Sequence, residues 1–220
     1  MFYTTDTRQH GLAFDPFKAL VVPRPIGWIS TISDDGVPNL APFSFFNAIA
    51  DNPPMIMLSF GGHNDTLRNL QANGEASCSF ANKAMMDQMN MSSAGVDGSV
   101  NEFELAGVAG AESKLIKPMR VADSPAAMEC RLWKSIELPP RADGSAGYTT
   151  VILSVEGVYI NDDYIVDGRV DTAAMEPLAR LGYMDYAVIN KDNMFSLNRP
   201  EVDADKKTAT LKSGPWSGKY

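Results

Sequence analysis

Two neighbouring stretches, IGWISTIS at residues 26–33 and VPNLAPFSF at residues 37–45, carry the pattern that decides the fold. The first is rich in β-branched and aromatic side chains, which favour a strand. Asp34-Asp35-Gly36 is typical of a hairpin turn, so the second stretch is expected to return as the partner strand. Pro38 and Pro42 lack the amide hydrogen that a central strand needs, which predicts that this second strand lies at an edge or bulge.

The rest of the chain continues the alternation of strands and short helices. Further strands are expected at 55–60, 76–80, 127–138 and 148–160, and helices at 16–20, 63–70, 83–91, 103–106 and 173–181. The connections are short and rich in turn residues, and no GxGxxG follows a strand. We therefore expect a mainly β antiparallel barrel with short helices and not a doubly wound sheet. The 220 residues suit a single domain with a core at about 17–200 and a polar tail at 201–220.

Charge and hydropathy exclude several classes of partner. The net charge of −8 at pH 7 repels phosphate backbones and anionic lipids, so neither nucleic acid nor a membrane is an expected partner. The first ten residues lack the basic and apolar regions of a signal peptide, and the apolar runs are too short to span a bilayer. These features indicate a cytoplasmic protein.

Conventional catalytic and metal-binding groups are scarce. Cys78 and Cys130 stand outside any CxxC motif and are expected to be small apolar strand residues, with a reactive thiol as the alternative. The only histidines, His10 and His63, are not at metal-ligand spacing, so no metal is expected. No acid–base pair or nucleophilic triad is recognisable, and no catalytic side chain is assigned.

Residues 61–66, GGHNDT, join the end of a strand to the start of a helix. Free backbone N–H groups at a helix start can bind an anion, and Thr66 can add a hydroxyl while His63 adds positive charge. Plain capping of the helix by Asn64 is the alternative. The pattern alone leaves both interpretations open.

The two arms of the predicted hairpin combine apolar bulk with small hydroxyl groups. Such a mixture suits a flat heteroaromatic ligand, because hydroxyls and amides can bind its polar edge while apolar side chains cover its faces. Alternating serine and threonine also marks the solvent face of an ordinary strand. Composition does not decide between these readings.

The order of several motifs resembles the flavin reductase-like family, which includes flavoredoxins and the reductase components of two-component flavin monooxygenases. The matching stretches are 24–31, 39–46, 65–69, 102–107, 124–130 and 177–186. The resemblance runs from about Phe17 to Pro200. It implies a split β-barrel of Greek-key type and a homodimer that binds FMN near the subunit interface.

The resemblance also implies positions for the cofactor. By matching position, the isoalloxazine ring and ribityl chain would be lined by Trp28, Ile29, Ser30, Thr31, Ser44, Phe45, Phe46 and Asn47. The phosphate end would meet Ser59, Phe60, Asp65 and Thr66, with Arg24 and His63 adding charge, and Tyr183 and Tyr186 would close over the ring. Family members often carry a lysine before the Asp-Thr pair, where this chain has Asn64.

The function implied is that of an oxidoreductase in which FMN carries the chemistry and NAD(P)H is the electron donor. Reduced FMN would pass to a partner oxygenase or another electron acceptor. A flavoredoxin-like electron-transfer protein and a flavin-binding carrier or sensor without turnover are the alternatives. The sequence does not distinguish NADH from NADPH.

Overall fold

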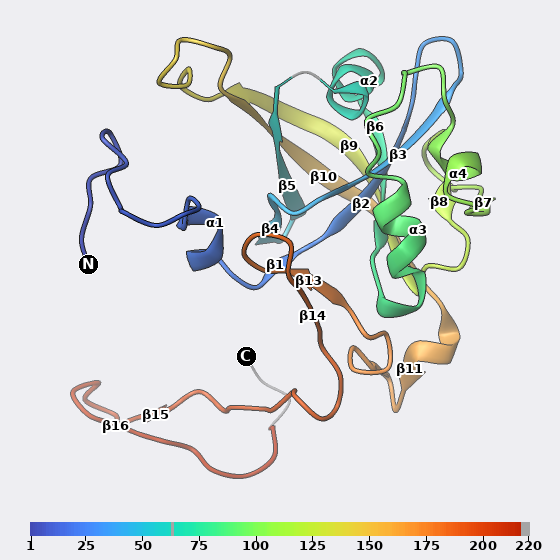
Figure 1. Cartoon of the computed structure of the whole chain (residues 1–220). Helices are drawn as coiled ribbons and strands as arrows, with labels where there is room; N and C mark the ends of the chain where they lie inside the picture. The colour runs from blue at the N-terminus through green and yellow to red at the C-terminus, as the bar shows by residue number, and fades with distance from the viewer. Residues whose placement is uncertain (63, 217–220) are drawn as a thin grey trace.

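The computed structural model describes residues 1–62 and 64–216, and its main feature is a seven-stranded antiparallel sheet (Figure 1). In spatial order the strands are β3 (Pro38–Phe43), β2 (Gly27–Ile32), β6 (Glu75–Phe80), β9 (Ala126–Glu137), β10 (Tyr148–Ile160), β5 (Pro54–Gly61) and β4 (Phe46–Asp51). The edge strands β3 and β4 are not paired with each other, so the sheet stays open between them. The mainly β expectation is confirmed, and so is the edge position that Pro38 and Pro42 predicted for β3.

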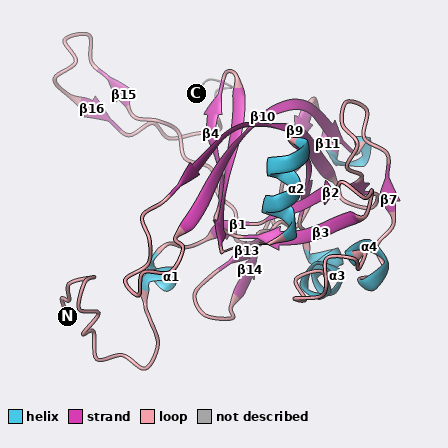
Figure 2. Cartoon of the chain, turned by 90° about the horizontal axis from the view of Figure 1, so that it is seen from above, coloured by secondary structure: helices cyan, strands magenta, loops and turns pink. Residues whose placement is uncertain are grey.

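Four small sheets surround the large one. They are β1 (Arg24–Pro25) with β13 (Leu178–Arg180) and β14 (Tyr186–Val188), β7 (Gly110–Ala111) with β8 (Arg120–Val121), β11 (Ile165–Val166) with β12 (Arg169–Val170), and β15 (Glu201–Val202) with β16 (Ala209–Thr210). The β15–β16 hairpin extends away from the large sheet, as two views show (Figures 1 and 2).

The helices are short. They are α1 (Phe17–Leu20), α2 (Asp65–Asn73), the 3₁₀ helix η1 (Lys83–Met85), α3 (Met86–Met91), α4 (Glu102–Leu105) and the 3₁₀ helix η2 (Asp162–Tyr164). The Asn64 side chain caps α2 by accepting the Leu67 N–H at 2.9 Å, and Gly74 ends the helix in the left-handed conformation. None of the helices in residues 1–62 and 64–216 has the length and apolar character that crossing a membrane requires.

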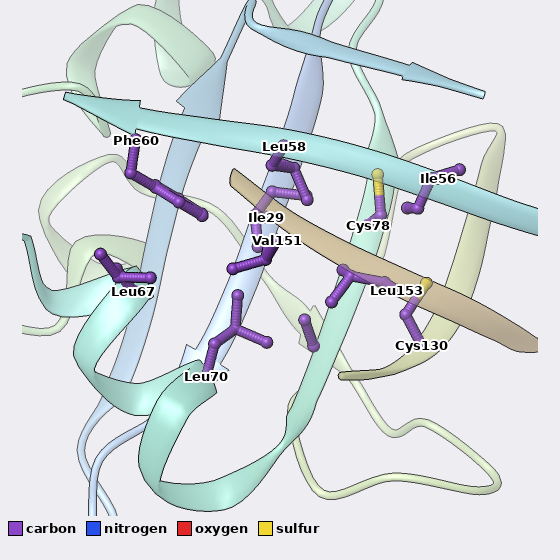
Figure 3. Close-up of a cluster of buried hydrophobic side chains, with 11 residues drawn as sticks. Ile29, Ile56, Leu58, Phe60, Leu67, Leu70, Cys78, Cys130, Val151 and Leu153 are labelled. Atoms are coloured by element: carbon purple, nitrogen blue, oxygen red, sulfur yellow. The ribbon is translucent and has the colours of Figure 1, made fainter. Parts of the chain in front are cut away.

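Two hydrophobic clusters hold these elements together. In the first, Leu67 and Leu70 of α2 pack against buried side chains of the sheet that include Ile29, Leu58 and Val151 (Figure 3). The second lies around Trp28 and gathers side chains from β3, α3, α4 and β13. Full burial of each large apolar side chain contributes about 1.5–3 kcal/mol, so α2 is held chiefly by its leucine face.

Both cysteines are buried in the first cluster. Cys78 lies on β6 and Cys130 on β9, and both are free thiols. The reading of the cysteines as small apolar strand residues is confirmed.

The helix expected at 173–181 is wrong. Residues 172–175 form a turn, and β13 follows at Leu178–Arg180 between β1 and β14. Pro177 cannot donate the hydrogen bond that a helix interior requires. Its carbonyl instead accepts the N–H of Ile189, and the N–H of Leu178 donates to Ala81. Strand β4 was not expected, since the hairpin arm predicted to run to Phe45 ends at Phe43.

Candidate functional site

A cavity of about 700 Å³ lies where the edge strand β3 meets the start of α2. Its other walls come from the segment that follows α3 and from the first residue of α4. The residues that line it include Asn39, Phe43, Asn64, Asp65, Thr66, Arg68, Ser92 and Glu102. The volume falls in the range of about 300–1,000 Å³ that is usual for sites of small molecules and cofactors.

The start of α2 gives the cavity a place for an anion. Among the described residues the backbone N–H groups of Asp65 and Thr66 have no acceptor, because Asn64 caps only Leu67 and Arg68. Both residues line the cavity. The Asp65 carboxylate forms an ion pair with Arg68 at 2.6 Å, so its charge is largely offset. A phosphate group fits this position, since it would accept the free N–H groups at the positive end of the helix. Capping by Asn64 therefore leaves these two N–H groups available to an anion.

Thr66 itself is turned toward the protein interior. The residue is 1% exposed, and its hydroxyl donates to the Asn39 side-chain oxygen at 2.7 Å. The same oxygen accepts the Thr31 hydroxyl at 3.1 Å, and the Asn69 amide donates to Thr31 at 3.1 Å. This buried network joins β2, β3 and α2 directly behind the cavity wall.

Asn39 is the member of this network that lines the cavity, and sequence reasoning did not single it out. Its oxygen is used twice, whereas its amide nitrogen has no acceptor within the described chain and is not fully buried. The fixed amide can therefore donate to a ligand. In the sequence, its place in the 39–46 motif was the signal that could have identified it. In the structure, it pairs with Thr31 across the sheet.

The other side chains expected around the flavin ring on β2 also face inward. Trp28 is fully buried, and its indole N–H donates to Ser92 Oγ at 2.9 Å. Ile29 belongs to the first hydrophobic cluster. The Ser30 hydroxyl is buried and has no partner among residues 1–62 and 64–216, and the same holds for Ser77 opposite it on β6. Of the four residues from Trp28 to Thr31, none lines the cavity with its side chain.

Arg24 holds three backbone carbonyls in place. Its guanidinium donates to Lys18 O at 2.6 Å, Val21 O at 2.7 Å and Leu181 O at 2.8 Å. A longer contact of 3.5 Å joins it to Ser44 Oγ. The structure thus brings Arg24 and Ser44 together, but the Arg24 guanidinium already donates to three backbone carbonyl groups.

A separate group of expected site residues lies where β3 leads into β4 and β5. The Ser59 N–H donates to Phe45 O at 2.9 Å, and its hydroxyl bonds that of Thr150 at 2.8 Å. The Phe45 ring lies 5.5 Å from that of Tyr148. The first two residues of β4 differ, since Phe46 packs against the first hydrophobic cluster and Asn47 is exposed.

Phe60 supports the cavity from behind. It is 1% exposed, and its ring meets that of Phe43 edge-on at 4.8 Å between centroids. Phe43 lines the cavity directly. The aromatic pair therefore gives the cavity a rigid apolar wall.

Tyr183 lies in the turn between β13 and β14, Tyr186 is the first residue of β14, and neither lines the cavity. Tyr183 is half exposed, and its ring lies 5.9 Å from Phe14. The Tyr186 hydroxyl accepts a hydrogen bond from Arg180. Neither covers the cavity in a single chain. His63 lies outside the described residues.

The chain is similar in sequence and in fold to known proteins. The family model described as flavin reductase like domain matches residues 19–175. An uncharacterised protein of Aquifex aeolicus is 34% identical over 171 residues, which is 74% of this chain and 83% of that protein.

Two solved structures are similar over almost their whole length. Nitrilotriacetate monooxygenase component B from Bacillus cereus has a TM-score of 0.82 at 26% identity, covering 90% of this chain and 98% of that one. An FMN-binding protein from Thermus thermophilus has a TM-score of 0.70 at 15% identity, covering 89% and 99%. The second likeness concerns the fold alone.

Proposed function

The chain belongs to the flavin reductase-like family, and from that premise we propose that it binds FMN in this cavity and reduces it with NAD(P)H. The observation that carries the proposal is the cavity itself. It combines an anion-binding helix start, a fixed amide donor and an apolar aromatic wall. A flavin mononucleotide needs these three elements for its phosphate, its polar atoms and its ring.

Particular residues would hold each part of the cofactor. The free N–H groups of Asp65 and Thr66 would bind the phosphate, the Asn39 amide would donate to a polar atom, and Phe43 would contact the ring. Bound flavin supplies the redox chemistry by accepting a hydride from the nicotinamide. The protein positions the two rings, and no side-chain acid or base is needed for that transfer.

The charge at the phosphate position is modest. Asn64 stands where family members often carry lysine, and Arg68 already pairs with Asp65. The overall charge of −8 also opposes an incoming dianion. These features favour an FMN that exchanges with solution and therefore favour a reductase that releases its product.

We also propose the split barrel and the homodimer that the family resemblance implies. The open edge between β3 and β4 supports the first. The extended C-terminal segment supports the second, because Phe195, Leu197 and Leu211 are each 80–90% exposed. An isolated two-stranded hairpin such as β15–β16 is marginally stable, and a second subunit would cover it.

The similarity to a monooxygenase component points to the acceptor. Nitrilotriacetate monooxygenase component B is by its name one part of a larger system. By analogy, this chain would supply reduced FMN to a partner oxygenase.

Two measurements test the proposal. The first is fluorescence titration of the purified protein with FMN, in which saturable binding is expected and its absence would refute flavin binding. The second is oxidation of NADH and NADPH at increasing free FMN. Turnover that rises and saturates with FMN identifies a reductase. Reduction of bound flavin without exchange would identify an electron-transfer protein, and binding without reduction would identify a carrier.

A further inference from the structure

Glu102 places a negative charge in the cavity wall that the proposed phosphate and ring contacts do not use. It is the first residue of α4, which is capped by Asn101, and it is 4% exposed. One carboxylate oxygen, Oε2, accepts the backbone N–H of Leu40 on the edge strand β3 at 3.1 Å. This bond positions the carboxylate beside Asn39 in the cavity wall.

The second carboxylate oxygen has no partner in the described part of the chain. It forms no ion pair there, and the Glu102 side chain has no hydrogen bond besides that from Leu40. Within the described residues, the fully buried polar side-chain atoms without a partner are Ser30 Oγ and Ser77 Oγ. The free Glu102 oxygen is not among them and is therefore accessible. Since Glu102 lines the cavity, a ligand there can reach this oxygen.

An ionised carboxylate in such a wall selects for hydrogen-bond donors. It can accept a charge-assisted bond from a hydroxyl group and repels a phosphate. Carboxylates at other nucleotide sites bind sugar hydroxyls in this way. The start of α2 provides a separate position for the phosphate, so the carboxylate is free for the uncharged sugar portion of a nucleotide.

We propose that the free oxygen of Glu102 accepts a hydrogen bond from a sugar hydroxyl of the bound nucleotide. This inference rests on the proposed function, and it assigns Glu102 a direct role in recognition. The hydroxyl comes either from the ribityl chain of the flavin or from the ribose of the nicotinamide cofactor.

The test is Glu102→Gln, with Glu104→Gln as the matched control. A glutamine keeps an oxygen for the Leu40 N–H and replaces the free acceptor with an uncharged amide. Glu104 lies on the same helix but is exposed and outside the cavity wall. Thermal unfolding of both variants checks that the fold is retained.

Affinities are measured for FMN, riboflavin and lumiflavin, which lacks the ribityl chain. If the ribityl chain is the donor, Glu102→Gln weakens FMN and riboflavin by about ten-fold and leaves lumiflavin unchanged. If the nicotinamide ribose is the donor, flavin affinities stay constant while KM for NADH at saturating FMN rises by about ten-fold. Glu104→Gln changes neither quantity.

Three results would overturn the inference. The first is that Glu102→Gln has wild-type flavin affinities and a wild-type KM for NADH. The second is that it loses affinity equally for FMN, riboflavin and lumiflavin. The third is tighter binding of FMN alone, which would mean that Glu102 only repels the phosphate. If Glu102→Gln does not fold, the wild-type protein is tested with altered ligands instead. Its affinity is measured for flavins that lack single ribityl hydroxyls, and its KM is measured for NADH analogues that lack single nicotinamide-ribose hydroxyls. Unchanged values for all of these ligands would overturn the inference.

The outcome is separable from that of the proposed function. Failure of the wild-type protein to bind FMN would refute both proposals. Wild-type binding together with an unaffected Glu102→Gln variant would refute only the role of Glu102.

Discussion

Thr66→Val is expected to weaken FMN binding by loosening Asn39. The substitution keeps the size of the side chain but removes the hydroxyl that donates to Asn39 Oδ1 at 2.7 Å. Because Thr31 still donates to the same oxygen at 3.1 Å, the acceptor is not left bare. The cost should therefore be that of one neutral hydrogen bond, about 1 kcal/mol of unfolding free energy. For a chain of this length that corresponds to a fall in Tm of about 2–4 °C.

The effect on binding arises because two hydroxyls, those of Thr66 and Thr31, hold the Asn39 side chain by donating to its oxygen. With one of these hydrogen bonds instead of two, the amide nitrogen is held less firmly toward the ligand, and FMN affinity should fall by about five-fold. Thr66→Ser is the matched control, since it loses a methyl group worth about 0.8 kcal/mol but keeps the hydroxyl. Thermal unfolding should show a similar loss for both variants, whereas fluorescence titration should show weaker FMN binding only for valine. Equal FMN affinity in the two variants would refute the role of Asn39.

Three further predictions concern the hydrogen bonds and thiols of the interior. Trp28→Phe loses both the bond to Ser92 and part of the buried ring volume, so urea denaturation should show a loss of about 2–3 kcal/mol, and unchanged stability would mean that neither contributes. Arg24→Lys replaces a guanidinium that serves three carbonyls with a single ammonium, and about 2 kcal/mol should be lost by the same assay; a fully stable variant would contradict this. Burial raises the pKa of the Cys130 thiol from 9.0 to about 12 and also raises the pKa of Cys78, so a thiol reagent should label the protein only after unfolding. Because the unfolded thiols ionise first, their contribution to stability should be complete below pH 9 and be lost between about pH 9 and 12, which unfolding at several pH values would reveal.

The parts of the fold that local pattern predicted are those with strong local signals. The hairpin around Asp34-Asp35-Gly36 and the capped helix between Asn64 and Gly74 form as expected, because turn and capping chemistry act over a few residues. The prediction of a helix at 173–181 was wrong because the conformation of this segment depends on strands that are distant in the sequence. Its strand is fixed by β1 and β14, and neither pairing is visible in the local sequence.

The sequence located the elements around the cavity but not the direction of their side chains. The motifs identified the start of α2 and the β2–β3 hairpin, which both border or support the cavity. The alternation of apolar and hydroxyl residues along β2 did not indicate which face of the strand a helix would cover. Asn39 and Glu102 lie within quoted motifs, yet their roles depend on Thr66 and Leu40, which approach them only in the folded chain.

The 24–31 motif therefore acts at one remove from the ligand. Trp28 donates to Ser92 and Thr31 donates to Asn39, and both acceptors line the cavity. Arg24 approaches Ser44 in the turn that follows β3. A buried donor left without its acceptor costs about 1–3 kcal/mol, so the motif constrains where these polar groups can lie. If the cavity binds FMN as proposed, these residues support its wall, and a substitution among them should change stability and affinity together. Glu102→Gln should change affinity alone.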